Sequence, residues 1–202
     1  MNSTKNECIP EGGNPLVVAI GGSAGGFKPI MRIVQQLPEW FAGVVIVATH
    51  RPPDSKNVLL DIVRAHTRVE TSEPQDEHCL ECTTIYVGKP DDTVEVHNNA
   101  FDLTRDSSKW ARLRRIDDLF VSVAESAGPR SVGIILSGLL NDGTAGLKAI
   151  RQAGGYCIVQ SPEEADFPDM PLNALREVDA QFVGSVEEIS SVLMEYSIGR
   201  HC

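Results

Sequence analysis

The sequence lacks the features that mark several common classes of protein. Its apolar runs are all well below the roughly 20 residues that a membrane-spanning helix needs, and the N-terminal segment has no apolar core of the kind a secretory signal carries. Basic residues are not in excess: 18 Lys and Arg stand against 28 Asp and Glu, and the 202-residue chain has a formal net charge of −10. Nucleic acids and anionic membranes repel such a surface. We therefore expect a cytoplasmic protein with no nucleic-acid partner and no direct membrane insertion.

Cysteine is also scarce, with five residues at irregular spacing: Cys8, Cys79, Cys82, Cys157 and Cys202. An odd number without a regular framework favours a reducing compartment over a set of structural disulfides. The segment His78-Cys79-Leu80-Glu81-Cys82 has the residue types of a zinc site, yet the sequence has no second C-x-x-C or H-x-x-x-H pair to complete it. We expect an ordinary surface loop there and no metal site.

What the sequence does contain is an alternation of apolar runs and helical patterns, in a chain that is 42% hydrophobic. Continuous apolar runs predict buried strands at residues 16–20, 44–48, 131–136, 156–160 and 181–183. Helical spacing predicts helices over residues 25–36, 115–127, 144–153 and 186–196, and another that starts near Asp54. Strands that are apolar on both faces and alternate with helices indicate an α/β fold with a mostly parallel sheet covered on both sides.

The middle of the chain departs from this alternation. Residues 84–88 and 93–97 flank the turn 89–92 and predict a β-hairpin at one edge of the parallel sheet, with a further strand at 100–104. The polar, Gly- and Pro-containing residues 1–14 indicate a flexible N-terminal arm. One domain is expected over residues 15–197, followed by a short tail at 198–202.

The stretch Val18–Gly26, VAIGGSAGG, places Ser23 among four glycines directly after the first apolar run. A dinucleotide-binding turn needs G-x-G-x-x-G and an acidic residue about 20 residues further on, and neither is present. A P-loop is excluded because no Gly-Lys-Ser/Thr follows. The stretch does fit G-x-S-x-G, in which small neighbours let the chain turn sharply and expose a serine hydroxyl. A plain glycine-rich strand-to-helix turn fits the pentapeptide equally well.

Two residues far along the chain favour the serine nucleophile. A serine hydroxyl needs an imidazole to take its proton, and the imidazole needs a carboxylate to fix its tautomer. His50 ends the second predicted strand and Asp142 follows the strand at 131–136, so both fall at the carboxyl edge of a parallel sheet, as Ser23 does. Individually, His50 is explained as a loop residue and Asp142 as a helix cap. Their common placement predicts a Ser23–His50–Asp142 triad.

With these residues in view, the chain resembles the catalytic domain of chemotaxis-type protein-glutamate methylesterases (CheB-type), over nearly all of Leu16–Leu193. The matching segments are Gly21–Gly26 (Gly-x-Ser-x-Gly-Gly), Thr49–Pro52 (His and a proline-containing loop), Ile85–Val87 (Ile-Tyr-Val), Asp117–Ala124 (Asp-x-Leu-Phe-x-Ser-Val-Ala), Leu136–Gly146 (Leu-Ser/Thr-Gly-x-x-x-Asp-Gly-x-x-Gly) and Met170–Ala174 (Met-Pro-x-x-Ala). Only a short segment precedes Leu16, where the family usually has a receiver domain, so we expect a stand-alone catalytic domain.

The resemblance implies a doubly wound, predominantly parallel α/β sheet flanked by helices, with an antiparallel β-hairpin at one side. It implies that Ser23 is the nucleophile, His50 the general base and Asp142 the orienting carboxylate. The oxyanion and substrate region would contain Ala24, Gly25, Leu139, Leu140 and Met170. The substrates would be glutamate γ-methyl esters, and for some members glutamines, on the cytoplasmic helices of chemoreceptors. Other chemosensory signalling proteins are further expected partners, and no metal or organic cofactor is implied.

The chain departs from the family pattern close to the predicted site. Ala24 stands where threonine is usual, and Leu139-Leu140 replaces a usual Met-Gly. A glycine at position 140 would leave more room beside the ester, so we expect Leu140→Gly to raise turnover at a modest loss of stability. Three functions stay open: a methylesterase of chemosensory receptors, an esterase for another protein or small ester, and a non-catalytic relative that binds a receptor or a signalling partner.

Overall fold

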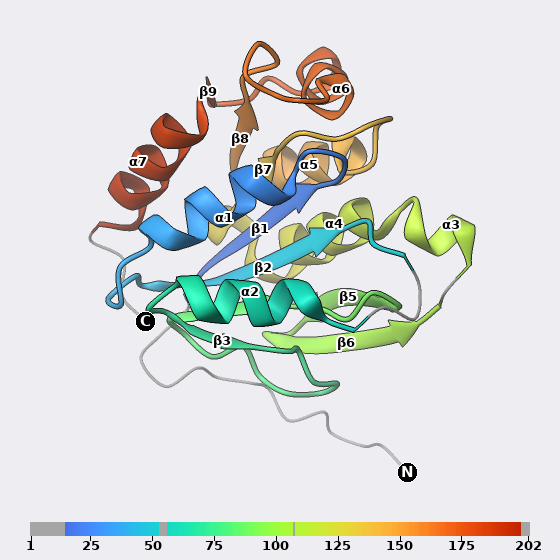
Figure 1. Cartoon of the computed structure of the whole chain (residues 1–202), viewed down its shortest axis with the longest axis vertical. Coiled ribbons are helices and arrows are strands. Elements are labelled where there is room, and N and C mark those ends of the chain that lie inside the picture. Colours follow the sequence, from blue (N-terminus) through green and yellow to red (C-terminus); the bar gives the residue numbers. More distant parts are fainter. Residues whose placement is uncertain (1–14, 53–55, 107, 199–202) are drawn as a thin grey trace.

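Seven parallel strands form the central sheet in the computed structural model, which describes residues 15–52, 56–106 and 108–198 (Figure 1). They run in the order β3-β4-β2-β1-β7-β8-β9. Their bounds are β1 (Leu16–Gly22), β2 (Gly43–Thr49), β3 (Glu70–Ser72), β4 (Thr84–Val87), β7 (Ser131–Ile135), β8 (Tyr156–Gln160) and β9 (Phe182–Gly184). Every pairing in this sheet is parallel, which confirms the expected α/β architecture.

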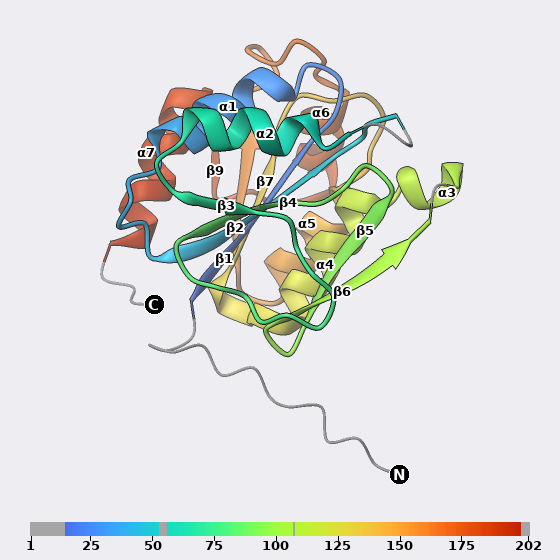
Figure 2. The ribbon, with the colours of Figure 1, turned by 60° about the horizontal axis from the view of Figure 1, so that its bottom comes forward.

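Helices cover both faces of this sheet, as Figure 2 shows from a second side. One face is covered by α1 (Phe27–Gln36), α2 (Val58–His66) and α7 (Val186–Ser197), and the other by α4 (Arg115–Ala127), α5 (Thr144–Gln152) and α6 (Asp169–Glu177). The short α3 (Lys109–Arg112) and a 3₁₀ turn (Gly128–Arg130) flank α4. None of the helices within the described ranges has both the length and the hydropathy that crossing a membrane requires.

The central strands are uniformly apolar because both of their faces are buried. Within β1, Val18 and Ile20 belong to the core under α1, α2 and α7, whereas Val17 and Ala19 belong to the core under α4 and α5. All seven residues of β1 and all seven of β2 are buried. A strand of this kind cannot show the alternation of a half-exposed strand, which is why continuous apolar runs were the correct signal.

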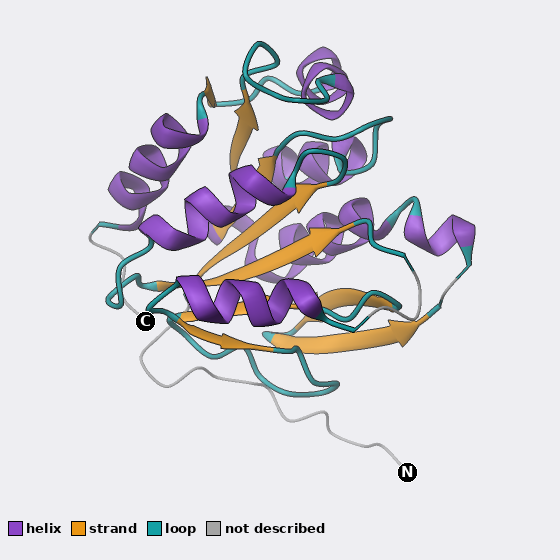
Figure 3. Ribbon diagram, in the orientation of Figure 1, coloured by secondary structure: helices purple, strands orange, loops and turns teal. Residues whose placement is uncertain are grey.

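The predicted hairpin is wrong in its first strand. Thr84–Val87 is β4, which lies between β2 and β3 in the parallel sheet. The antiparallel hairpin consists of β5 (Asp92–His97) and β6 (Ala100–Arg105), which form a separate two-stranded sheet (Figure 3). Its connection is Asn98-Asn99, and both residues have positive φ, 52° and 60°. Two-residue hairpin loops need this left-handed conformation, and asparagine tolerates it better than most residues.

Four elements were missed altogether: β3, α3, α6 and the 3₁₀ turn. β3 has three residues and α3 has four, too few to show a periodicity. The helix expected from near Asp54 begins at Val58, and Asp54 itself lies outside the described residues. The predicted arm at residues 1–14 also lies outside them, as does the tail from residue 199 onward.

The expectation of reduced cysteines is wrong for two of the five. Cys79 and Cys82 are disulfide-bonded, whereas Cys157 is free and buried. Burial raises the pKa of the Cys157 thiol to about 12, so that thiol stays protonated at neutral pH. The inference failed because an odd total excludes complete pairing of all cysteines but does not exclude a disulfide within a subset of them.

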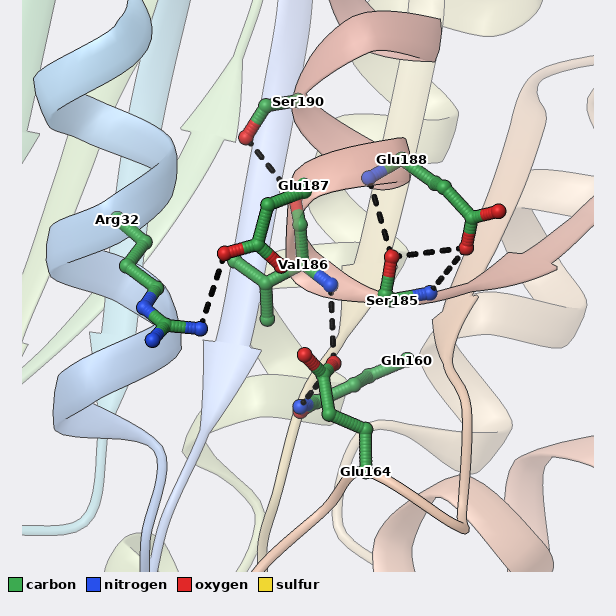
Figure 4. A network of polar contacts seen from close by, with 8 residues as sticks. All are labelled: Arg32, Gln160, Glu164, Ser185, Val186, Glu187, Glu188 and Ser190. Atoms are coloured by element: carbon green, nitrogen blue, oxygen red, sulfur yellow. Dashed lines mark hydrogen bonds and ion pairs between the residues drawn. The ribbon is translucent and has the colours of Figure 1, made fainter.

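Helix α7 is fixed to the rest of the fold at its first turn (Figure 4). The hydroxyl of Ser185 accepts a hydrogen bond from the Glu188 backbone N–H at 3.3 Å, and the Glu188 carboxylate accepts one from the Ser185 N–H at 2.8 Å. These two bonds form a capping box, which satisfies N–H groups that a helix start otherwise leaves free. Glu164 accepts from the Val186 N–H at 2.9 Å, and Glu187 pairs with Arg32 of α1 at 3.0 Å.

Removing this cap should destabilise the fold. We expect Ser185→Ala to lower the free energy of unfolding by about 1 kcal/mol, the usual effect of losing a helix cap. The hydrogen bonds from Ser185 lower the pKa of Glu188. The contribution of the Glu188 carboxylate to the stability of the fold is therefore present at neutral pH. It is lost as pH falls through the range in which this carboxylate becomes protonated. Urea denaturation at neutral and acidic pH measures both effects.

The matched control is Ser191→Ala, also on α7. Its hydroxyl donates to the Glu187 carbonyl within the helix and caps nothing. We expect little change in stability from this substitution. Equal losses for Ser185→Ala and Ser191→Ala would show that the capping box does not stabilise α7.

Candidate active site

The three residues of the predicted triad follow three adjacent strands. Ser23 follows β1, His50 follows β2, and Asp142 lies in the loop after β7; β1 pairs with β2 on one side and with β7 on the other. The strands that follow β1 in the chain are added first on the β2 side of the sheet and then on the β7 side. The strand order therefore reverses at β1. In parallel sheets the carboxyl ends at such a point form a crevice where ligands bind.

Hydrogen bonds join the three side chains in a continuous chain. Ser23 Oγ lies 3.0 Å from His50 Nδ1, and His50 Nε2 lies 2.6 Å from Asp142 Oδ2. Because the carboxylate can only accept, Nε2–H donates to Asp142 and Nδ1 is left to accept from the Ser23 hydroxyl. In serine proteases of the chymotrypsin type the two ring nitrogens have the opposite roles. Either nitrogen can take a proton from serine, so the direction of proton transfer is the same.

The Asp142 carboxylate is buried, at 4% exposure, and the N-terminus of α4 holds it. Its Oδ2 accepts from the Ile116 backbone N–H at 3.1 Å, and its Oδ1 accepts from the Asp117 N–H at 2.9 Å. The positive end of the helix dipole also favours a negative charge at this position. These contacts replace the water that a buried carboxylate loses, and they fix the plane of the carboxylate relative to His50.

Asp117, in turn, binds a backbone N–H group at the start of the next helix, α5. Its carboxylate accepts from the Gly146 N–H in the first turn of α5 at 2.8 Å. Burial raises the pKa of Asp117, opposed by that hydrogen bond, and the nearby Asp142 charge raises it further. Gly143, at φ 92°, turns the chain between Asp142 and α5; a Cβ there would lie 2.5 Å from Ile135 Cδ1.

The turn that contains Ser23 is fixed by the loop after β7. The Ser23 N–H donates to the Ser137 carbonyl at 2.9 Å, and the Ser137 hydroxyl donates to the Ala24 carbonyl at 2.8 Å. Gly25 follows with φ 71°, where a Cβ would come within 2.6 Å of the Ser137 hydroxyl. Glycine is required here on both counts. The nucleophile therefore projects from a turn that is held by hydrogen bonds on both sides.

Sequence reasoning missed the roles of Ser137 and Gln160. The side-chain oxygen of Gln160 accepts from the Ser137 N–H at 2.9 Å, and both residues are buried. Gln160 is the last residue of β8, so it extends the site to a fourth strand. A polar side chain at the end of a buried strand was the signal that could have identified it.

The predicted oxyanion region divides into exposed and buried parts. The backbone N–H groups of Ala24 and Leu139 donate to no acceptor among the described residues, so both are free to bind a substrate oxygen. Met170, by contrast, is fully buried and its N–H donates to the Gly138 carbonyl at 3.0 Å. A Cβ on Gly138 would overlap the Met170 sulfur and would lie 3.0 Å from Ser23 Cβ. Met170 therefore supports the loop from beneath.

The other described histidines lie away from this chain of hydrogen bonds. His66, at the end of α2, contacts the Ile62 carbonyl, while His78 and His97 are exposed. Within residues 15–52, 56–106 and 108–198 no cluster of three or more His, Cys, Asp or Glu side chains is arranged to hold a metal ion.

A serine, a histidine and a buried aspartate joined by hydrogen bonds at the carboxyl edge of a parallel sheet form the arrangement that serine hydrolases use. Comparison with known proteins makes the assignment specific. The chain belongs to the CheB methylesterase family, which matches residues 18–193.

The curated relatives and a solved structure agree with this assignment. The chain is 30% identical over 200 residues to "Protein-glutamate methylesterase/protein-glutamine glutaminase 2" of Pseudomonas aeruginosa, and 28% identical over 197 residues to a similarly named protein of Carboxydothermus hydrogenoformans. The matches cover 95% of this chain but only 57% of each relative. The crystal structure of the Thermotoga maritima CheB methylesterase catalytic domain superposes with a TM-score of 0.81 at 25% identity, over 90% of this chain and 98% of that one.

Leu140 has a strained backbone conformation, which bears on the stability expected of Leu140→Gly. Its φ is 66°, in the left-handed region that disfavours residues with a Cβ, and its carbonyl accepts from the Asn173 side chain at 2.7 Å. Its side chain is 60% exposed, so little packing offsets this strain. This strain opposes the modest loss of stability expected for Leu140→Gly, and we revise that prediction accordingly.

We predict that Leu140→Gly is as stable as the wild type or gains up to about 1 kcal/mol, because relief of left-handed strain offsets the added freedom of the unfolded chain. Leu139→Gly is the matched control, since Leu139 is also exposed and has no positive φ. This variant should lose about 0.5 to 1 kcal/mol. Chemical denaturation of both proteins measures the difference, and equal losses would contradict the assigned strain.

Proposed function

We propose that this protein is a protein-glutamate methylesterase that hydrolyses glutamate γ-methyl esters on the cytoplasmic helices of chemosensory receptors. The observation that carries the proposal is the hydrogen-bonded chain Ser23–His50–Asp142 in a member of the CheB methylesterase family. The names of the curated relatives support the substrate class. A cytoplasmic location, among chemosensory signalling proteins, is part of the same proposal.

In the first half of the reaction, Ser23 Oγ attacks the ester carbonyl while His50 Nδ1 takes the hydroxyl proton. The imidazolium donates through Nε2 to the Asp142 carboxylate, which stabilises its positive charge. Collapse of the tetrahedral intermediate breaks the bond to the methoxy oxygen, and His50 gives the proton to methanol as it leaves. The substrate glutamate is then joined to Ser23 as an ester.

In the second half, water attacks the acyl-enzyme with His50 again acting as base. The bond to Ser23 Oγ breaks, the proton returns to the serine, and a free glutamate carboxylate is released. The N–H groups of Ala24 and Leu139 bind the negative oxygen in both tetrahedral intermediates. A donor of this kind typically contributes about 10²- to 10³-fold in rate.

The same site supports glutamine deamidation. The names of the relatives include protein-glutamine glutaminase, and a glutamine side chain has the same carbonyl in the same position relative to the backbone. Attack by Ser23 would produce the same acyl-enzyme, with ammonia as the leaving group in place of methanol. An esterase for another substrate and a non-catalytic binding protein are the alternatives to both activities.

Alanine substitutions test the proposal. Ser23→Ala, His50→Ala and Asp142→Ala should each reduce release of methanol from a methylated receptor peptide by on the order of 10⁴-fold or more, as in comparable triads. His66→Ala is the matched control, because this exposed histidine lies outside the hydrogen-bonded chain, and its activity should equal that of the wild type.

Circular dichroism would show that each variant is folded. Methanol release by Ser23→Ala at the wild-type rate would exclude Ser23 as the nucleophile. A wild-type protein that binds the peptide but releases neither methanol nor ammonia would favour the non-catalytic alternative.

A further inference from the structure

The disulfide between Cys79 and Cys82 has no part in the proposed reaction. It closes a loop with only two residues between the cysteines, Leu80 and Glu81. A cross-link stabilises a fold chiefly by restricting the unfolded chain, and its effect is smallest for the shortest loops. Structural disulfides are densest in small domains that lack an adequate core, whereas this chain has a large core on each face of its sheet. Structural stabilisation alone is therefore a poor explanation of this disulfide.

The disulfide lies where the chain passes from the two-stranded sheet to the parallel sheet. On one side, Cys79 pairs with Ala100 of β6 in an antiparallel bridge, and the Leu80 N–H donates to the Asn99 carbonyl at 2.8 Å. On the other side, only one residue separates Cys82 from β4 of the parallel sheet. The covalent bond therefore fixes the turn that connects the two sheets.

The two residues between the cysteines are attached to the fold beneath them. Leu80 is 2% exposed and belongs to the core that also contains Tyr86 and Phe101. The Glu81 N–H donates to the Tyr86 hydroxyl at 3.2 Å. Breaking the S–S bond would leave these contacts possible but would return conformational freedom to the turn. Reduction should therefore weaken the attachment of this segment without unfolding the chain.

The disulfide is accessible to a reductant. Cys79 is exposed and Cys82 is half-buried, whereas Cys157 is fully buried. Exposed disulfides are the ones that exchange readily with thiols. Neither Cys79 nor Cys82 begins a helix, so the helix N-terminus that activates the thiolate of disulfide oxidoreductases has no counterpart here. The pair is suited to being reduced by another molecule rather than to reducing other proteins.

We propose that Cys79 and Cys82 form a reversible thiol–disulfide exchange site for an external dithiol. A thiolate of the dithiol attacks Cys79 Sγ, the bond to Cys82 Sγ breaks, and Cys82 leaves as a thiolate that takes up a proton. The second thiol of the reductant then attacks the reductant sulfur of the mixed disulfide. Cys79 is released as a thiol and the reductant becomes a disulfide, so two electrons and two protons pass to the protein. In the cytoplasmic location that belongs to the proposed function, such reductants keep cysteines reduced.

The redox state of this site should affect the candidate active site through α4. Hairpin β5-β6, to which Cys79 is bridged, packs on α4 (Figure 2), where the Val96 N–H donates to the Ser122 hydroxyl at 3.0 Å. The N-terminus of α4 holds the Asp142 carboxylate. Coupling through packed elements typically changes an activity by about 2- to 30-fold. We expect the reduced protein to be the slower form, a consequence that rests on the proposed function.

Alkylation followed by peptide mass spectrometry tests the exchange site on the whole chain. After treatment with oxidised glutathione and its removal, iodoacetamide should label neither Cys79 nor Cys82, and their peptide should have the mass of an intramolecular disulfide. After dithiothreitol without denaturant, both cysteines should be labelled. Cys157 is the internal control, because this buried thiol should stay unlabelled in both samples. Labelling of Cys79 and Cys82 in the oxidised sample, or reduction only in denaturant, would overturn the proposal.

Melting curves measure the effect on the fold. Reduction should lower the melting temperature of the wild type by about 4 to 8 °C, as loss of a short cross-link predicts. The matched control carries Cys79→Ser and Cys82→Ser. It should melt at the temperature of the reduced wild type and should respond to neither glutathione nor dithiothreitol. Equal melting temperatures for the oxidised and reduced wild type would show that the disulfide does not hold the turn.

Methanol release from a methylated receptor peptide tests the coupling to the triad. The oxidised wild type should be about 2- to 30-fold faster than the reduced wild type, and the double serine variant should match the reduced rate under both conditions. Equal rates for the two redox states would contradict the coupling through α4. If neither state releases methanol, the proposed function fails, while the labelling experiment still decides whether Cys79 and Cys82 form an exchange site.

Discussion

The contact between the Asp142 carboxylate and the first turn of α4 is the constraint on which the rest of the candidate site depends. The N–H groups of Ile116 and Asp117 hold both carboxylate oxygens, and one of those oxygens also holds His50. A buried carboxylate without these donors would lose its hydration without compensation. The position of α4 therefore determines the orientation of His50, which in turn faces Ser23. Helix α4 and the strands therefore both determine the geometry of the site.

Small residues allow α4 and the loops to come this close. A Cβ on Gly21 would lie 2.4 Å from Ile116 Cγ2, and a Cβ on Gly146 would lie 2.4 Å from Phe120 Cβ. Larger side chains at these two positions would move α4 away from β1 and α5, and would take the donors of Ile116 and Asp117 out of reach of Asp142. Gly138 has the same role on the other side of Ser23, where Met170 fills the space beneath it. The geometry of the candidate site therefore requires close packing at these glycines.

Much of this arrangement could be predicted from the sequence because it depends on local patterns. Continuous apolar runs predicted the main parallel strands, since residues buried on both faces leave a signal in the run itself. The rule that parallel strands share one carboxyl edge then brought Ser23, His50 and Asp142 together without any knowledge of distances. The hairpin was assigned incorrectly because a strand beside a turn has the same pattern whether its partner lies in a hairpin or in a distant sheet. Asn98-Asn99 carried the correct turn signal.

The sequence by itself therefore determined the order of the main parallel strands and of most of the helices that cover them, the class of fold and the three residues of the candidate triad. Only the tertiary structure decided which ring nitrogen of His50 faces Ser23, and that Ser137 and Gln160 fix the nucleophile turn. It also joined Cys79 and Cys82 in a disulfide and placed Cys79 against Ala100 of β6. The physical reason is that strand and turn preferences act between near neighbours in the chain. Hydrogen-bond partners and buried charges depend instead on residues that meet only after the sheet and its helices have packed.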